Sequence, residues 1–291
     1  SRGPPSRHGC PGRARARTEA AAAETGLAPG TPVLAGTIDA AAEAVSVGVR
    51  DAGDMMMMYG STIFIIQVAD RAVRDPRLWY APWLAPGTHA SMAGLATSGT
   101  LTHWFRDHFA RELMRDAAFP TLAAEAETAP PGAKGLLFLP YFSGERTPIH
   151  DPNAKGAFFG LNLLHNRGDL FRAVLEGIAN GTAHVVETFR EVEAAPQRIL
   201  AVGGGTKNAL WLQATSDIAQ VPQIVCEKTI GASYGDAFLA ACAIGLAQPD
   251  DIARWNPPVQ TVTPVAHDVY AKQYALFKRL YEQTKDIAAA L

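Results

Sequence analysis

Two short apolar segments, residues 55–58 and 63–68, are separated only by the turn Tyr59-Gly60-Ser61-Thr62. Apolar runs of this length, bounded by glycine and hydroxyl residues, are typical of β-strands joined by a tight turn. The segment therefore predicts a hairpin of two apolar strands, with the run of four methionines at 55–58 as a buried strand. Residues 89–95 form a candidate third strand.

Helices and strands alternate over the rest of the chain. Apolar spacing predicts helices over 99–115, 169–192, 207–219, 233–244 and 269–291, and strands at 136–140, 199–202 and 223–226. Near the start, a short buried strand at 31–36 and a helix over 39–48 are expected, whereas 112–134 is expected to run over the surface. Strands followed by a strand-helix alternation predict an α/β domain with a mixed central sheet.

Charge and cysteine content exclude several classes of protein. The 26 Lys and Arg residues nearly balance the 28 Asp and Glu residues, so nucleic acid or an anionic membrane is not expected as the main partner. The longest uncharged apolar runs fall short of a membrane span. The 3 cysteines show no CxxC spacing, which argues against a disulfide framework and a zinc site and favours a cytoplasmic location.

Residues 1–18 differ from the rest of the chain because they are rich in Arg, Pro and Gly and contain no acidic residue. We expect a disordered or atypical basic tail, or a wrongly framed end. A basic nucleic-acid arm and a transit-peptide remnant are the alternatives. The first methionine is Met55, so Ser1 is not an ordinary translation start, and a fragment or a processed chain is expected.

Three segments contain candidate functional residues, and Asp39 is in the first. This aspartate lies where an apolar segment gives way to a helix of small residues. An aspartate in this place most often caps the helix. Alternatively, its carboxylate is a general base that accepts a proton from a substrate hydroxyl during group transfer.

The other two segments are rich in glycine. Gly60-Ser61-Thr62 offers backbone N–H groups and two hydroxyls that can bind phosphate oxygens, although a plain hairpin turn also has this composition. Gly203-Gly204-Gly205 follows a predicted strand and opens a helix, which permits close backbone approach and favours anions. The run has neither GxGxxG nor GxxxxGK[ST] spacing, so by itself it leaves nucleotide binding open.

Together these segments resemble the FGGY carbohydrate kinases. The second signature of that family is matched at two blocks separated by seven residues, Gly156-Ala157-Phe158-Phe159-Gly160-Leu161 and Asp169-Leu170-Phe171-Arg172-Ala173-Val174-Leu175-Glu176. Upstream, Pro140-Tyr141-Phe142-Ser143-Gly144-Glu145-Arg146-Thr147-Pro148 is similar to a loop of xylulokinase-like members. The glycine run with Asn208 and the 231–245 segment follow in the family's order, and the resemblance covers about residues 19–291.

The resemblance implies a fold and a division into domains. Members of the family have two actin-like domains, with ATP and Mg²⁺ in the cleft between them and the sugar deeper inside. We therefore expect an actin-like (ribonuclease H-like) ATPase domain, with a mixed central sheet flanked by helices, over residues 53–291. Residues 19–52 would be the end of the N-terminal domain, whose Asp-x-Gly-Thr phosphate and Mg²⁺ loop has no counterpart here.

The resemblance also implies residue roles. Asp39 falls on the catalytic base, and Gly60-Ser61-Thr62 falls on the hairpin that contacts the transferring phosphates. The Gly203-Gly204-Gly205 turn would also hold phosphates, and Gly204 and Asn208 would line the adenine nucleotide. No residue is predicted as a metal ligand, because Mg²⁺ would bridge phosphate oxygens. Ala40 after Asp39, and Ser61-Thr62 in the hairpin, depart from the commoner family residues.

The predicted function is ATP-dependent transfer of the γ-phosphate to a hydroxyl of a sugar, with a ketopentose such as xylulose as the first candidate. Ribulose, gluconate, glycerol and other polyols stay open. The alternative is a non-catalytic orphan half that binds nucleotide or is inactive, because half a cleft cannot pre-organise both substrates. An unpaired domain would expose an apolar face, so a homo-oligomer or a missing N-terminal domain is the expected partner.

Overall fold

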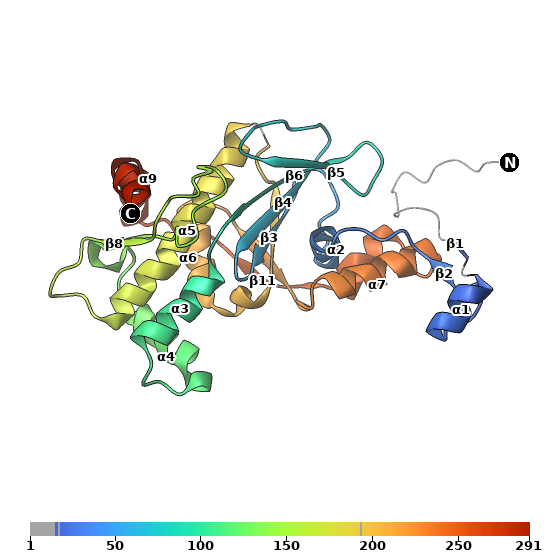
Figure 1. The fold of residues 1–291 in the computed structure, drawn as a ribbon, viewed down its shortest axis with the longest axis horizontal. Coiled ribbons are helices and arrows are strands. Elements are labelled where there is room, and N and C mark those ends of the chain that lie inside the picture. The colour runs from blue at the N-terminus through green and yellow to red at the C-terminus, as the bar shows by residue number, and fades with distance from the viewer. Residues whose placement is uncertain (1–14, 17, 193) are drawn as a thin grey trace.

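The computed structural model describes residues 15–16, 18–192 and 194–291, and Figure 1 shows their arrangement. The helices are α1 (Glu19–Thr25), α2 (Asp39–Ser46), α3 (Gly99–Phe109), α4 (Arg115–Thr128), α5 (Arg167–Glu191), α6 (Ala209–Ala219), α7 (Ala232–Ala243), α8 (Ile252–Trp255) and α9 (Asp268–Ala290). The strands are β1 (Arg15–Ala16), β2 (Pro32–Val33), β3 (Asp54–Tyr59), β4 (Ile63–Ala69), β5 (Trp79–Pro82), β6 (His89–Leu95), β7 (Leu137–Leu139), β8 (Ala157–Phe159), β9 (Arg198–Val202), β10 (Gln223–Cys226) and β11 (Pro258–Val262).

A mixed sheet forms the centre of the molecule. Its strand order is β11-β10-β9-β3-β4-β6-β5. Strands β3, β9 and β10 are parallel to one another, and the remaining neighbours pair antiparallel. The mixed α/β architecture with flanking helices that the sequence predicts is confirmed, as is the β3–β4 hairpin.

Both faces of the sheet are covered, which explains why its central strands are mostly apolar. Successive residues of a strand point to opposite faces. Met55 and Met57 accordingly pack into the core beneath α5 and α6, whereas Met56 packs into a second core that contains Ala44 of α2. Figure 1 shows α5 and α6 on one side of the sheet and α2 and α7 on the other.

Strand directions bring three loop segments to one edge of the sheet. Strands β3, β9 and β6 run the same way, because β6 is antiparallel to β4 and β4 is antiparallel to β3. In register, Met58 lies opposite Val202 and Ile63 lies opposite Leu95. The hairpin turn, the segment after β6 and the glycine run after β9 therefore leave the sheet side by side.

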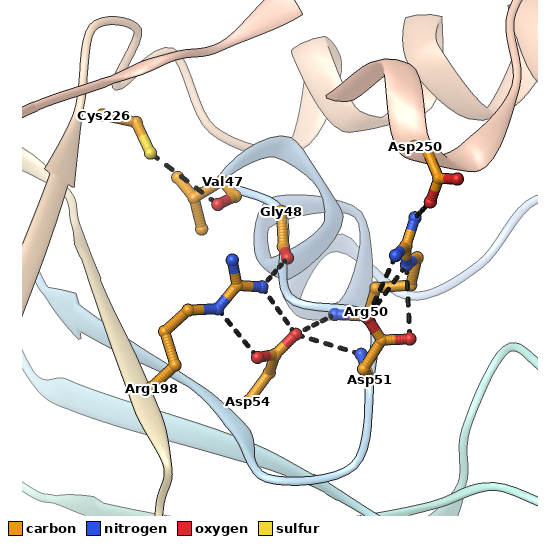
Figure 2. A network of polar contacts seen from close by, with 8 residues as sticks. All are labelled: Val47, Gly48, Arg50, Asp51, Asp54, Arg198, Cys226 and Asp250. Atoms are coloured by element: carbon orange, nitrogen blue, oxygen red, sulfur yellow. Dashed lines mark hydrogen bonds and ion pairs between the residues drawn. The ribbon is translucent and has the colours of Figure 1, made fainter. Parts of the chain in front are cut away.

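An ion-pair network fixes the opposite edge, where β3 begins (Figure 2). The Asp54 carboxylate, 6% exposed, accepts hydrogen bonds from the backbone N–H groups of Arg50 and Asp51 at 3.0 Å each. It also accepts two from the Arg198 guanidinium, at 2.8 and 2.7 Å. Arg198 donates in addition to the Gly48 carbonyl at 2.8 Å, so the network ties the end of α2 to β3 and β9.

Helices α2 and α7 pack with their backbones in close contact. A Cβ atom at Gly235 of α7 would lie 1.8 Å from the carbonyl oxygen of Ala42 in α2. Small residues on both helices permit this approach, and Ala42 and Ala44 are fully buried. Residues 39–49, which the family resemblance assigns to the end of an N-terminal domain, thus share a core with the central sheet.

Some local predictions are wrong. The expected buried strand at 31–36 is only β2, whose two residues are exposed. Segment 112–134, expected to run over the surface, contains α4. Ala118, Leu122 and Ala126 recur on one face of this helix and are buried, and α4 packs on α5. Strands β5, β8 and β11 were not predicted. Most of the predicted basic tail, residues 1–14 and 17, lies outside the described residues.

No helix in the described part of the chain combines the length and the apolar character needed to cross a bilayer.

Substitution of Gly235 by Ala tests the α2–α7 contact. Alanine is the better helix former by about 1 kcal/mol, yet its methyl group would meet the backbone of α2. We expect a net loss of roughly 2–3 kcal/mol in the free energy of unfolding, measured by urea denaturation. Ser233→Ala, an exposed change on the same helix, is the control. A Gly235→Ala variant as stable as wild type would contradict the close packing.

The Asp54 network predicts a contrast between two neighbouring aspartates. Asp54→Ala leaves two backbone N–H groups and the Arg198 guanidinium without their acceptor, so we expect a loss of about 2–3 kcal/mol in unfolding free energy. Asp51→Ala removes only an exposed pair with Arg50 and should cost less than about 1 kcal/mol. Equal effects of the two changes in urea denaturation would show that the buried network does not hold this edge together.

Candidate functional site

A cleft of about 670 Å³ opens at the sheet edge where β3 and β9 end. One wall is the hairpin turn, and a second is the glycine run with the start of α6. The third wall comes from α3 and α4. In that order, the lining residues are Tyr59, Gly60 and Ser61; Gly204, Gly205, Lys207, Asn208 and Trp211; and Gly99, Thr102, His103, Phe119, Pro120 and Ala123.

The cleft brings together five of the residues predicted from the sequence. Gly60 and Ser61 face Gly204, Gly205 and Asn208 across it, although the two groups are separated by more than 140 residues in the chain. The other predicted hairpin and turn residues, Thr62 and Gly203, adjoin these but do not line the cleft.

The three glycines of the run have different surroundings. Gly203 has φ +97°, and a Cβ atom there would lie 2.7 Å from the Tyr59 carbonyl oxygen. A Cβ atom at Gly205 would lie 2.5 Å from the Trp211 ring. A Cβ atom at Gly204 would have no atom within 4 Å among the described residues, its chain neighbours aside. Packing therefore accounts for Gly203 and Gly205, whereas Gly204 leaves open space in which a ligand can approach the backbone closely.

Asn208 begins α6 and holds the turn in place. Its Oδ1 accepts the Trp211 backbone N–H at 3.0 Å, as an N-cap residue does. Its own backbone N–H donates to the Gly205 carbonyl at 3.0 Å. Because the cap uses only the amide oxygen, and the amide nitrogen donates to no other described residue, Nδ2 is available to a ligand.

A buried polar network supports the floor of the cleft. The Tyr59 hydroxyl donates to Gln223 Oε1 at 2.5 Å, and Gln223 Nε2 donates to Ser216 Oγ at 2.9 Å. Burial raises the pKa of Tyr59 far above its usual value, so the phenol stays neutral. The Tyr59 and Trp211 rings meet edge to face with centroids 5.0 Å apart. This network joins β3, β10 and α6 beneath the hairpin and the glycine turn.

Asp39 lies on a different part of the molecule. It is the first residue of α2, exposed, and the N-cap position is Ile38. The N-cap role that an aspartate in this place most often has is therefore not the one observed. Asp39 Oδ1 instead accepts the backbone N–H of Ala40 at 2.8 Å. One turn later, burial raises the pKa of Glu43, and the Asp39 charge raises it further. Asp39 does not line the cleft.

The sequence did not predict the wall made by α3 and α4. His103 and Phe119 meet edge to face with centroids 5.0 Å apart, and Pro120 and Ala123 extend the same surface. Segment 112–134 was expected to run over the surface, so α4 was not recognised as a helix. The contact between His103 and Phe119 depends on how two helices pack, which apolar spacing within one segment does not reveal. This aromatic and apolar wall suits a planar ring.

The cleft does not form a metal site of its own. No carboxylate is among its lining residues. Over the described residues, no group of three or more His, Cys, Asp or Glu side chains is placed to hold a metal ion. A hard cation such as Mg²⁺ prefers several oxygen ligands, so in this cleft it would depend on oxygens that a ligand brings.

Residues 55–244 match the family model described as "FGGY family of carbohydrate kinases, C-terminal domain". The xylulose kinase of Bacillus subtilis is 31% identical over 93% of this chain and 54% of its own length. The gluconokinase of the same organism is 30% identical over 77% of this chain and 44% of its own. The chain thus spans about half the length of the curated relatives it matches.

A solved structure shows the same fold. The crystal structure of xylulose kinase from Rhodospirillum rubrum superposes with a TM-score of 0.87 at 35% identity, over 98% of this chain and 58% of that one.

Two neighbouring glycines are predicted to respond differently to a methyl group. Gly205→Ala would force the Trp211 ring and Tyr59 apart and should lower the free energy of unfolding by roughly 2 kcal/mol. Gly204→Ala meets only open space and should change it by less than about 0.5 kcal/mol. Urea denaturation of both variants decides the point, and a Gly204→Ala variant as unstable as Gly205→Ala would refute the distinction.

Proposed function

The chain belongs to the FGGY family of carbohydrate kinases, and from this premise we propose that it is the nucleotide-binding half of an ATP-dependent sugar kinase. The kinase transfers the γ-phosphate of ATP to a hydroxyl of a sugar. The observation that carries the proposal is the convergence of the hairpin, the glycine turn and Asn208 on one cleft.

We assign the two ends of the cleft to the two ends of the nucleotide. The adenosine lies between the Gly204 backbone and the apolar wall of α3 and α4, with Asn208 Nδ2 as a hydrogen-bond donor. The phosphates extend to the hairpin. There, Ser61 is exposed, and its hydroxyl makes no hydrogen bond within the described residues. The backbone N–H groups of the Gly203–Gly205 turn add further donors for anionic oxygens.

The chemical step requires positioning more than covalent assistance. The sugar hydroxyl oxygen attacks the γ-phosphorus, the bond to the bridging oxygen breaks, and ADP leaves. Asp39 accepts the hydroxyl proton as general base. Its carboxylate is suited to that role because it is exposed and only Oδ1 is engaged, by Ala40. Mg²⁺ bound to the phosphate oxygens would neutralise charge that the cleft residues do not.

The substrate is proposed from the relatives. Xylulose is the first candidate, because xylulose kinases match nearly the whole chain. Gluconate is the second candidate, because a gluconokinase has a similar sequence identity to this chain, although over a shorter stretch. The cytoplasmic location expected from the cysteines stays a prediction.

A second candidate function is an orphan half that binds nucleotide without catalysis. One observation favours it: Asp39 does not line the cleft. Under either function the partner is an N-terminal domain or a second copy of this chain, which would supply the opposite side of the cleft.

Nucleotide binding by the chain itself tests the proposal. Calorimetry with ADP and ATP, with and without Mg²⁺, should show binding that Asn208→Ser weakens about tenfold, because serine still caps α6 but lacks the amide donor. Gly204→Val should also weaken it, by filling the open space. Asp39→Ala should leave nucleotide affinity unchanged.

Asn153→Ala, in an exposed loop, is the matched control for the loss of an asparagine. Absence of nucleotide binding by a folded wild-type chain would overturn the proposal for this chain. If binding is present, adding the N-terminal domain of a xylulose kinase relative and assaying sugar phosphorylation separates the kinase from the orphan half.

A further inference from the structure

Glu145 carries a buried carboxyl group that the proposed function does not use. It lies in the loop between β7 and β8 and is 5% exposed. It borders a second cavity, of about 330 Å³, together with Ala96, Ser143, Arg146, His150 and Pro152. No ion pair joins it to the neighbouring Arg146 guanidinium within the described residues.

The two oxygens of this carboxyl group differ in their contacts. Oε1 accepts the backbone N–H groups of Ala96 and Arg146, each at 2.7 Å. Oε2 is buried and has no hydrogen-bond partner among the residues that the structure describes. Burial raises the pKa of Glu145 to about 7, against the opposing effect of the two N–H groups and the Arg146 charge. An uncompensated buried oxygen is costly, so the loop holds this carboxyl group at some expense in stability.

Ala96 connects Glu145 to the hairpin of the cleft. It directly follows β6, and residues 98–100 bind the hairpin carbonyls. The Gly99 N–H donates to the Gly60 carbonyl at 3.0 Å, and the Ser98 N–H donates to the Ser61 carbonyl at 3.0 Å. The hydroxyl groups of Ser98 and Thr100 donate to the same two oxygens, each at 3.0 Å.

The junction has little room to adjust. A Cβ atom at Gly99 would lie 2.4 Å from the Gly60 carbonyl oxygen, so the start of α3 sits directly on the hairpin. On the other side, the Thr97 hydroxyl donates to the Pro140 carbonyl at the beginning of the Glu145 loop. A displacement of Ala96 is therefore passed to Gly60 and Ser61 rather than absorbed between them.

We propose that Glu145 is a positioning residue for the phosphate-binding hairpin. By holding the Ala96 N–H, its carboxyl group fixes residues 96–100, and these fix the orientation of Gly60 and Ser61. The inference rests on the proposed function for its consequence, phosphate binding, but its structural part is independent of any ligand. It assigns Glu145 no contact with the nucleotide.

Hydrogen–deuterium exchange tests the structural part without a ligand. In Glu145→Ala, peptides covering 59–63 and 96–101 should exchange about tenfold faster, because the Ala96 amide loses its hydrogen-bond acceptor. Glu145→Gln should restore near wild-type exchange, since its carbonyl oxygen can accept the same two N–H groups. Glu187→Gln is the control, because Glu187 is a half-buried carboxylate of α5 paired with Lys278 rather than with a backbone N–H group.

Faster exchange confined to residues 141–155 would overturn the proposal, because Glu145 would then anchor only its own loop. The proposal also fails if Glu145→Gln exchanges as fast as Glu145→Ala, since a hydrogen bond would not be the link. Faster exchange across the whole chain in Glu145→Ala would indicate global unfolding of that variant. The proposal then depends on the other two variants: exchange at 59–63 should be near wild type in Glu145→Gln and faster in Thr100→Val. Thr100→Val removes a hairpin contact directly and should speed exchange at 59–63.

Nucleotide affinity tests the functional part. Glu145→Ala should lower the affinity for ADP and ATP about tenfold and leave the affinity for adenosine unchanged, because only the phosphates reach the hairpin. In the double variant with Thr100→Val the two losses should not add, since both act on one hairpin. An equal loss for adenosine and ATP would refute positioning of the phosphate end. If wild type binds no nucleotide, the proposed function fails, while the exchange experiment still decides the role of Glu145.

Discussion

The rest of the structure depends on burial of both faces of strand β3. Its alternate residues enter two separate cores, one beneath α5 and α6 and the other beneath α2. Because a shift of one residue would exchange the two faces, the register of β3 with β4 and β9 is strongly fixed. That register places the ends of β3, β6 and β9 at one edge. The cleft is thus a consequence of how the sheet is covered.

Within the cleft, structural and ligand-facing roles fall on adjacent residues. Gly203 and Gly205 are required because Tyr59 and Trp211 occupy the space where a side chain would lie, whereas Gly204 faces open space. The amide oxygen of Asn208 caps helix α6, and its amide nitrogen stays available to a ligand. The same division recurs at the hairpin, where α3 holds the carbonyl oxygens and the Ser61 hydroxyl stays available. Rigid backbone contacts therefore present a few polar groups to the cleft, as binding sites require.

In the proposed function, Asp39 and the cleft act from different parts of the molecule. Helix α2 is anchored on α7 through the Gly235 contact and on the sheet through the Asp54 network. Its first residue nevertheless lies outside the cleft that binds nucleotide in our proposal. A general base and a phosphoryl donor act together only when both substrates are held in line. In the proposed function, an N-terminal domain or a second copy of the chain supplies the opposite wall that aligns the two parts.

The sequence by itself determined the mixed α/β fold, the hairpin, the glycine turn and the family, because apolar periodicity and motif spacing are local properties of the chain. It did not determine α4, the edge strands β5 and β11, or the wall formed by His103 and Phe119. Nor did it reveal that Glu145 holds the segment behind the hairpin. Each of these depends on contacts between residues far apart in the chain, where packing and hydrogen bonding outweigh local preference. Only the tertiary structure brings those residues together.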